Sequence, residues 1–291
     1  MSLIQTNAIP PDQRSRWILA YLRHSPFALC LREINRLLAL ESLTGVTALG
    51  KDDRVLDVGC GDGFWWTLIR DNCKDVYGID VSASELSEAA RRIHVERVDI
   101  SQQVPFSGVR FAAVIGNCSL EHVRDINAAL RNMRACAQHE GRLILFVPTP
   151  QWSYQGHMQT YLLRHAPRLA MLWSGALNGF FQHWHLYDSD VWSAILTRNG
   201  WYPREVHGLG NDRSELLFRL FLPLSFAGFV FKKVFGIYPN RVLGLAPDWL
   251  LAPCHGLLEW ALKDPILRAD HPKAYEYMII ATAGSDDGRT A

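Results

Sequence analysis

Short apolar runs alternate with stretches of helical periodicity through the first half of the chain. Runs rich in β-branched residues are typical of strands buried on both faces of a sheet, while apolar residues every three or four positions indicate amphipathic helices. Strands are expected at residues 54–58, 75–80, 95–99, 111–116 and 141–147. Helices are expected between them at residues 65–72, 84–92 and 126–138. This alternation predicts an α/β fold, a parallel sheet with helices on both faces.

The patterning on either side of this region is less regular. Further elements are expected as helices at residues 13–24, 27–43 and 189–199, and as strands at residues 201–208 and 275–282. Asp188 or Ser189 is a suitable cap for the last of these helices, which is expected to end at Gly200. Residues 149–187 have weak periodicity and many aromatic residues, His and Gly.

A hydrophobic segment, residues 210–272, separates the last two expected strands. Prolines that favour breaks between short helices lie at Pro223, Pro239, Pro247, Pro253 and Pro265. We interpret the segment as a helical insertion, because a strand as late as 275–282 needs a sheet to join. The predicted organisation is an N-terminal helical cap at 1–44, a core at 45–209 plus 273–284, and an insertion at 210–272 that acts as lid or interface. Residues 284–291 are expected to be a frayed polar tail.

Composition narrows the class of protein. The chain of 291 residues is 48% hydrophobic and 20% charged, which is enough for a large core. A net charge of +1 gives no field that would concentrate nucleic acid, so a nucleic-acid partner is disfavoured. Six cysteines are scattered without a CxxC pair, and the N-terminus lacks the apolar core of a signal peptide. Reduced thiols and a cytoplasmic location are therefore expected.

Two apolar stretches, Leu169–Phe181 and Leu220–Phe231, are unusual for a soluble enzyme. The first is interrupted by Gly and Asn, and the second contains Pro223 and Gly228. Neither reaches the roughly 20 apolar residues that span a bilayer, so no transmembrane helix is expected. Contact with the inner face of a membrane, through 210–272, remains a hypothesis.

The strongest chemical signal is a glycine-rich turn after the strand at 54–58. Gly59, Gly61 and Gly63 let the backbone approach a ligand closely, and the following helix offers free N–H groups. Asp57 lies inside the strand, where a carboxylate needs a polar partner. Asp80 ends the next strand, where it can accept hydrogen bonds from both hydroxyls of a ribose. The spacing is GxGxG, whereas the dinucleotide fingerprint is GxGxxG.

Four segments in this order resemble the successive motifs of class I S-adenosylmethionine-dependent methyltransferases, above all the group of ubiquinone-type and lipid methyltransferases. They read VLDVGCGDG at 55–63, GID at 78–80, VDISQQVPF at 98–106, and NCSLEHVRDINAALRNM at 117–133 followed by GRLILFVPTP at 141–150. The resemblance implies a Rossmann-like seven-stranded sheet whose last strand is antiparallel. It also implies S-adenosyl-L-methionine as cofactor.

The resemblance assigns roles residue by residue. The methionine end of the cofactor is held by Asp57, Gly59, Gly61 and Gly63, the ribose by Asp80, and the adenine edge by Asp99 with Ile100, while Asn117 faces the methionine and the reacting methyl. Cys60 and Val81, beside these motifs, complete the predicted cofactor contacts. The sequence departs from the family at Phe64-Trp65-Trp66, where smaller residues are usual. Two tryptophans there either pack under the cofactor or crowd it.

Each of these residues has a simpler structural alternative. Asp80 could cap a helix that starts near Ser82 or Ser84. Asp99 alone is more typical of a turn, and Asn117 at a strand end is a common turn former. The order of the motifs, rather than any one residue, favours cofactor binding.

Two histidines are candidate catalytic residues. His122, in the pair Glu121-His122, could act as a base or metal ligand, but a buried structural pair is the more common arrangement. No further Glu or His at helical spacing completes a metal site, so no metal is predicted. His185 could deprotonate a hydroxyl acceptor near neutral pH, and shares a face with His183 if the chain is extended. The alternative for both is a structural hydrogen bond in a loop.

The predicted reaction is methyl transfer by in-line displacement at the sulfonium, giving O- or C-methylation of a small-molecule or lipid-like acceptor. Residues 149–187 and 210–272 are expected to form the lid and acceptor pocket, and their many aromatic residues favour a greasy acceptor or a membrane dock. Packing of these segments on each other, or on a second subunit in a homodimer, is the alternative. A nicotinamide-dependent oxidoreductase and a non-catalytic cofactor-binding scaffold are the competing functions.

Overall fold

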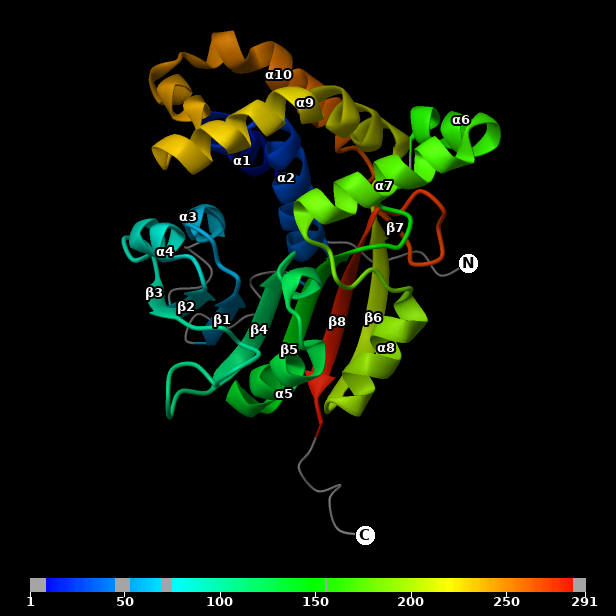
Figure 1. Cartoon of the computed structure of the whole chain (residues 1–291). Helices are drawn as coiled ribbons and strands as arrows, with labels where there is room; N and C mark the ends of the chain where they lie inside the picture. The colour runs from blue at the N-terminus through cyan, green and yellow to red at the C-terminus, as the bar shows by residue number, and fades with distance from the viewer. Residues whose placement is uncertain (1–8, 45–52, 70–74, 155, 285–291) are drawn as a thin grey trace.

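The computed structural model describes residues 9–44, 53–69, 75–154 and 156–284, and its centre is one eight-stranded sheet (Figure 1). The spatial order is β3-β2-β1-β4-β5-β8-β6-β7. The strands are β1 (Arg54–Val58), β2 (Asp75–Asp80), β3 (His94–Arg97), β4 (Phe111–Asn117), β5 (Ala137–Pro148), β6 (Trp201–Leu209), β7 (Ile266–Arg268) and β8 (Glu276–Ala283). The pairs among β1 to β5 are parallel, whereas β8 lies antiparallel between β5 and β6. The α/β fold and its antiparallel last strand are confirmed.

The sequence predicted a sheet of seven strands, whereas the sheet in the structure has eight. The additional strand, β7, pairs antiparallel with the end of β6 at the sheet edge. It belongs to the segment predicted as a purely helical insertion. A three-residue strand with one partner is too short to give an alternating pattern, so the sequence offered no sign of it.

Helices on both faces of the sheet bury alternate residues of the central strands. The flanking elements are α3 (Phe64–Ile69), α4 (Ala83–Ala89), η2 (Leu120–His122), α5 (Ile126–Cys136) and α8 (Ser189–Arg198). Val55 packs in one core with α1 (Pro11–His24) and α2 (Phe27–Thr44), while its neighbour Leu56 packs in the other with α5. Burial on both faces explains why the central strands are continuous apolar runs. The predicted helix at 65–72 is described only to Ile69, because residues 70–74 lie outside the described residues.

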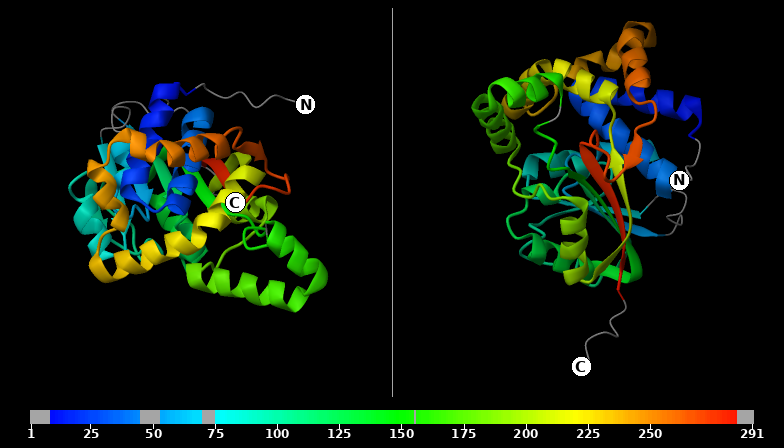
Figure 2. Two further views of the ribbon diagram at one scale, coloured as in Figure 1. Left: turned by 90° about the horizontal axis from the view of Figure 1, so that it is seen from above. Right: turned by 90° about the vertical axis from the view of Figure 1, so that its right-hand side faces the viewer.

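A layer of helices, here called the cap, lies over the end of the sheet where β1, β4 and β5 finish (Figure 1). It comprises α1 (Pro11–His24), α2 (Phe27–Thr44), α6 (His157–His165), α7 (Pro167–Phe181), α9 (Asp212–Phe235), η3 (Pro239–Leu245) and α10 (Asp248–Ala261). The pair α6 and α7 projects beyond the sheet (Figure 2). The cap therefore joins the N-terminal segment to the two weakly patterned segments of the sequence.

Pro239, Pro247 and Pro265 lie at helix starts or between elements, as predicted, but the other two prolines of the insertion do not break its helices. Pro223 lies inside α9 and Pro253 inside α10. Proline removes one hydrogen bond and can be tolerated where neighbouring elements hold the helix in place. Because α9 continues through Pro223, it spans 24 residues and is long and apolar enough to cross a membrane by length and composition, with 33% of its apolar window buried. The helix is thus longer than the stretch 220–231 considered in the sequence, but its length and composition alone do not show that it spans a membrane.

Candidate cofactor and acceptor sites

The glycine-rich turn after β1 has a backbone that only glycine adopts easily. Gly59, Gly61 and Gly63 all have positive φ, at 77°, 55° and 69°. A Cβ on Gly59 would lie 2.5 Å from the Cβ of Ser119, so that position has no room for a side chain. A Cβ on Gly61 would meet nothing within 4 Å, so this position faces open space. The amides of Gly59 and Cys60 donate to the carbonyl of Ile79, which holds the turn against β2.

Asp57 lies beneath this turn and is 3% exposed. The indole of Trp66 donates to its Oδ2 at 2.6 Å, while Oδ1 has no partner among the described residues. Burial raises the pKa of Asp57 to about 7, partly opposed by the Trp66 hydrogen bond. Trp65 is also buried and packs edge-on against Phe146. Both tryptophans therefore pack under the turn rather than projecting over it.

The raised pKa of Asp57 predicts how stability depends on pH. Between about pH 4 and pH 7 the folded protein retains a proton that the unfolded chain has released, so the free energy of unfolding falls as pH rises. Asp57→Asn removes this titration and keeps an acceptor for Trp66. We expect the variant to gain stability relative to wild type between pH 5 and pH 7.5, measured from urea midpoints. If the stability difference between the variant and wild type is the same at pH 5 and pH 7.5, Asp57 is ionised in the folded protein at both pH values.

Asp80 lies at the end of β2, directly beside the glycine-rich turn. Its Oδ2 accepts from the amide of Gly61 at 3.0 Å, and its Oδ1 from the amide of Ser82 at 2.8 Å. The side-chain cap of α4 comes from Ser82, which accepts from the amide of Glu85. The capping alternative for Asp80 is thus wrong, since Asp80 joins the turn to β2. Beside it, Val81 is 62% exposed, a large apolar side chain next to a carboxylate.

The other residues predicted to contact the cofactor, Asp99, Ile100 and Cys60, interact with neighbouring parts of the protein. Asp99 accepts from the amide and hydroxyl of Ser101 and from the Gln102 amide group, the pattern of a turn. Ile100 is buried. The side chain of Cys60 packs against Gly78, where a Cβ would lie 2.6 Å from its Sγ. Contact of these residues with a cofactor stays a prediction.

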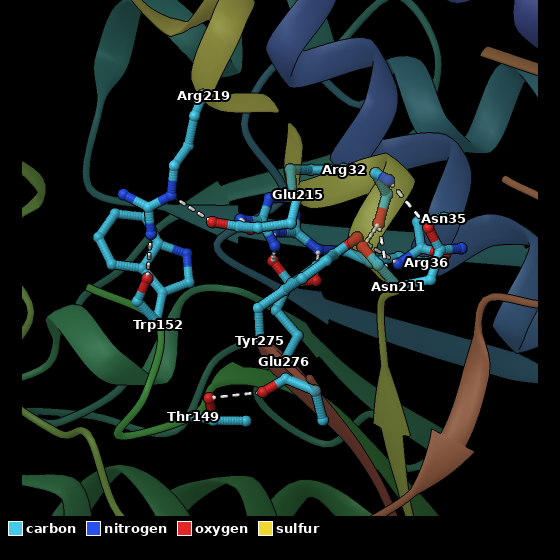
Figure 3. A network of polar contacts seen from close by, with 12 residues as sticks. Arg32, Asn35, Arg36, Thr149, Trp152, Asn211, Glu215, Arg219, Tyr275 and Glu276 are labelled. Carbon is cyan, nitrogen blue, oxygen red and sulfur yellow. Dashed lines mark hydrogen bonds and ion pairs between the residues drawn. The ribbon is translucent and has the colours of Figure 1, made fainter. Parts of the chain in front are cut away.

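Asn117, at the end of β4, belongs to a polar network that the sequence did not indicate. Its Nδ2 donates to Glu33 at 3.0 Å, and its Oδ1 accepts from Arg36 at 3.2 Å, both on α2. Arg36 also makes two bonds to Glu276, at 3.0 and 2.7 Å. Figure 3 shows how the network continues to α9, where Arg32 and Arg219 flank Glu215. Burial raises the pKa of Glu33, whereas for Glu276 the two arginines outweigh burial and lower it.

The residues around the turn fit S-adenosylmethionine. Gly61 faces open space, Asp57 presents an unpartnered buried oxygen beneath it, and Val81 leaves apolar surface exposed beside the Asp80 carboxylate. Such a cofactor has an amino group and a ribose that suit the two carboxylates, and supplies a methyl group activated by a sulfonium. Sheet order, turn and acidic residues together define a class I S-adenosylmethionine-dependent methyltransferase.

Comparison with known proteins supports this assignment to the methyltransferases. A family model described as "Methyltransferase domain" matches residues 21–206, more than half of the chain, so the chain belongs to this family. A malonyl-[acyl-carrier protein] O-methyltransferase of Enterobacter lignolyticus (strain SCF1) is 28% identical over 128 residues, 43% of this chain. The match spans only 50% of that relative's length.

Solved structures share the fold. A putative sarcosine dimethylglycine methyltransferase from Galdieria sulphuraria superposes with a TM-score of 0.51 at 11% identity, over 86% of this chain and 85% of the other. The [4+2]-cyclase SpnF gives a TM-score of 0.50 at 17% identity, over 86% and 81% of the two chains. At these identities the likeness extends to the fold alone.

The two candidate catalytic histidines lie where η2 meets residues 182–185. The amide of Trp184 donates to the carbonyl of Glu121 at 2.7 Å, which joins the segments. His185 is buried, and its ring nitrogens lie 2.7 Å from the carbonyl of Val123 and 3.0 Å from the hydroxyl of Tyr187. These contacts favour the structural alternative for His185, and its role as a base stays a prediction.

The same junction brings His183 beside the pair Glu121-His122, from which it is distant in the sequence. One ligand atom from each of Glu121, His122 and His183 lies within 4.8 Å of the others. Burial, together with the neighbouring His122, lowers the pKa of His183 to about 4, and burial raises that of Glu121. His183 lies too far along the chain for helical spacing to associate it with Glu121. Only the return of the chain after α7 makes them neighbours.

A cavity of about 980 Å³ lies in the cap, between α7 and α9. Its wall is mainly apolar, with Trp173, Leu177, Phe180, Phe181, Leu216, Leu220, Phe226 and Phe229 among the lining residues. Polar groups at its edge include Glu215 and Arg219, which also belong to the network in Figure 3. Phe181 stacks on His183 at 5.8 Å between ring centroids, so the cavity wall adjoins the η2 junction.

Proposed function

We propose that this protein transfers the methyl group of S-adenosylmethionine to an apolar, lipid-like acceptor. The observation that carries the proposal is the cap cavity, which is large, lined by aromatic and aliphatic side chains, and bordered by a few polar groups. Cavities of about 300–1,000 Å³ with such linings are typical of small-molecule sites. The relative named as a malonyl-[acyl-carrier protein] O-methyltransferase supports an oxygen acceptor on a small acyl group.

Methyl transfer asks little of the protein beyond alignment and exclusion of water. The sulfonium already activates the leaving group, so the protein has to hold the nucleophile in line with the methyl. A base is needed only if the acceptor loses a proton, and His122 is then the candidate with an accessible ring, since its side chain is 41% exposed. The wall of the cap would exclude water from the acceptor.

The experiment is transfer of a radiolabelled methyl group in detergent solution. Purified protein is incubated with labelled S-adenosylmethionine and either a lipid extract or a water-soluble metabolite extract. Label in the organic phase with the lipid extract alone supports the proposal. Label in the metabolite fraction alone rules out a lipid-like acceptor. Cofactor binding without transfer to either would favour the scaffold function.

A charge placed in the cavity should block the acceptor without affecting the cofactor. Phe226 lines the cavity, whereas Phe235 lies on the same helix outside the lining and is 64% exposed. Phe226 is itself 42% exposed, so a charge there loses solvent only when an apolar acceptor covers it. We expect Phe226→Asp to lower transfer to lipid at least about tenfold, because removing an unpaired charge from water against the acceptor costs several kcal/mol. Phe235→Asp is the matched control and should retain activity. Cofactor affinity, measured by calorimetry, should be unchanged in both.

The cap also exposes an apolar surface that suits a membrane. On η3 and α10, Val242, Leu245 and Trp249 are 82%, 97% and 75% exposed. Large exposed apolar patches mark interaction sites. We propose that the protein is cytoplasmic and docks through this surface on the inner face of a membrane, from which a lipid-like acceptor would enter the cap.

Liposome flotation tests the dock. We expect wild-type protein to float with vesicles containing anionic lipid, and Leu245→Glu to shift to the soluble fraction, because the charge opposes insertion. Val191→Glu is the control, since Val191 is an exposed aliphatic residue on α8, away from the cap. Wild-type protein that stays soluble would count against membrane contact and leave a second subunit as the partner for this surface.

A further inference from the structure

Glu121 and His183, for which the proposed reaction has no use, converge with His122 at the η2 junction. The ring of His122 faces that of His183, with centroids 5.6 Å apart and planes at 25°. Nε2 of His122 lies 3.8 Å from Oε1 of Glu121. The second carboxylate oxygen of Glu121 is buried and has no hydrogen-bond partner among the described residues. Since a buried, unpaired carboxylate oxygen is costly, its position needs a partner.

Hydrogen-bond contacts of Nδ1 orient the imidazole rings of both His122 and His183. Nδ1 of His122 lies 3.3 Å from the carbonyl oxygen of Gln182, and Nδ1 of His183 lies 3.3 Å from Oδ1 of Asn178. Each contact favours a proton on Nδ1, which leaves a lone pair on Nε2. Metal-binding histidines typically donate their other ring nitrogen to an oxygen in this way. The neighbouring rings of Trp152 and Phe181 fix the position of His183 further.

We propose that Glu121, His122 and His183 bind one divalent transition-metal ion of the zinc type. Two imidazoles and one carboxylate form the ligand set of zinc sites that keep a position open for water or substrate. Magnesium and calcium prefer oxygen ligands throughout, so they do not suit this set. Tetrahedral zinc separates its ligand atoms by about 3.3 Å, so the most distant pair has to approach by roughly 1.5 Å. The exposed side chain of His122 has room for that movement.

The location of this site beside the cap cavity indicates a role for the ion. Phe181 stacks on His183 and also lines the cap cavity, so the ion would lie behind one wall of the acceptor site. The binding claim itself is independent of the acceptor and of methyl transfer.

Zinc titration of the full chain tests the site. Protein stripped with a chelator and dialysed is titrated calorimetrically with Zn²⁺, and with Mg²⁺ in parallel. We expect one Zn²⁺ per chain, no Mg²⁺ binding, and visible absorption bands of a tetrahedral ion when Co²⁺ replaces Zn²⁺. Glu121→Gln and His183→Asn should weaken zinc binding at least about 100-fold, since loss of an outer partner alone costs about 10- to 100-fold. His139→Asn, at an exposed position in β5, is the control and should bind as wild type.

Each other outcome overturns the proposal. Absence of stoichiometric zinc in wild type would do so, as would wild-type affinity in the Glu121 and His183 variants. Equal binding of Mg²⁺ would show an oxygen site elsewhere. If Glu121→Gln does not fold, His122→Asn replaces it, because that side chain is exposed and its loss leaves the core intact.

Discussion

Replacement of Arg36 by methionine is expected to destabilise the fold by about 3–5 kcal/mol, because it removes the nearest cation from two buried carboxylates and leaves Glu276 only its longer contact with Arg32, at 3.6 Å. Arg36 is 7% exposed and makes two bonds to Glu276, which is 2% exposed. It also pairs with Glu33 at 2.9 Å. Methionine retains the apolar stem of arginine but leaves two acidic groups facing each other. Urea denaturation of the two proteins at pH 7 measures the difference.

An exposed pair of the same type provides the control. Arg268 also makes two bonds to a carboxylate, that of Asp270, but both side chains are largely exposed. Arg268→Met should leave the urea midpoint almost unchanged, because solvent screens such pairs. A small effect of Arg36→Met at pH 7 would mean that Glu33 and Glu276 are protonated there, contrary to the lowered pKa of Glu276.

Substitution of Gly61 by alanine is expected to weaken S-adenosylmethionine binding about 10- to 100-fold. The added Cβ enters the open space above the turn, and overpacking of this kind typically costs about 1–3 kcal/mol, which is roughly 5- to 150-fold in affinity and brackets the expected loss. The positive φ of Gly61 adds about 1–2 kcal/mol of backbone strain in the folded protein, with or without cofactor. Calorimetry with S-adenosylmethionine and S-adenosylhomocysteine measures the loss.

Gly108 separates the two effects. It has φ of 79° and likewise nothing within 4 Å of an added Cβ, but it lies in the exposed loop before β4. Gly108→Ala should therefore show the same backbone strain with unchanged cofactor affinity. Equal affinity in Gly61→Ala and wild type would place the cofactor elsewhere and refute the site.

The sheet was predictable because its strands are buried on both sides. Residues 54–58 and 75–80 were predicted with the bounds that the structure has for β1 and β2. The strand expected at 95–99 lies at His94–Arg97, because Asp99 forms a turn with Ser101. Buried strands and turns can be predicted from sequence because each depends on the types of neighbouring residues in the chain.

The cap was harder to predict, because its structure depends on contacts between distant segments. The charged residues Arg32, Glu33 and Arg36 interrupt an otherwise apolar helix, which was the available sign of a buried network. Their partner Glu276 lies on β8, so only the fold reveals the pairing. The apolar segments that form α7 and α9 were expected to surround an acceptor, and the cavity between them is consistent with that hypothesis.

One contact between cap and core has a consequence for how the site operates. Asp62, within the glycine-rich turn, pairs with His24 of α1 at 2.8 Å and lies 3.9 Å from Arg241 of η3. On α4, Glu85 pairs with Lys232 of α9 at 2.6 Å. Polar contacts of Asp62 and of Glu85 thus tether the turn and α4 to the cap.

A ligand that orders the turn must also order the cap, and the reverse holds equally by thermodynamic reciprocity. Donor and acceptor are therefore expected to bind cooperatively, and raised salt should weaken that cooperativity only slightly, because the side chains of these pairs are largely shielded from solvent.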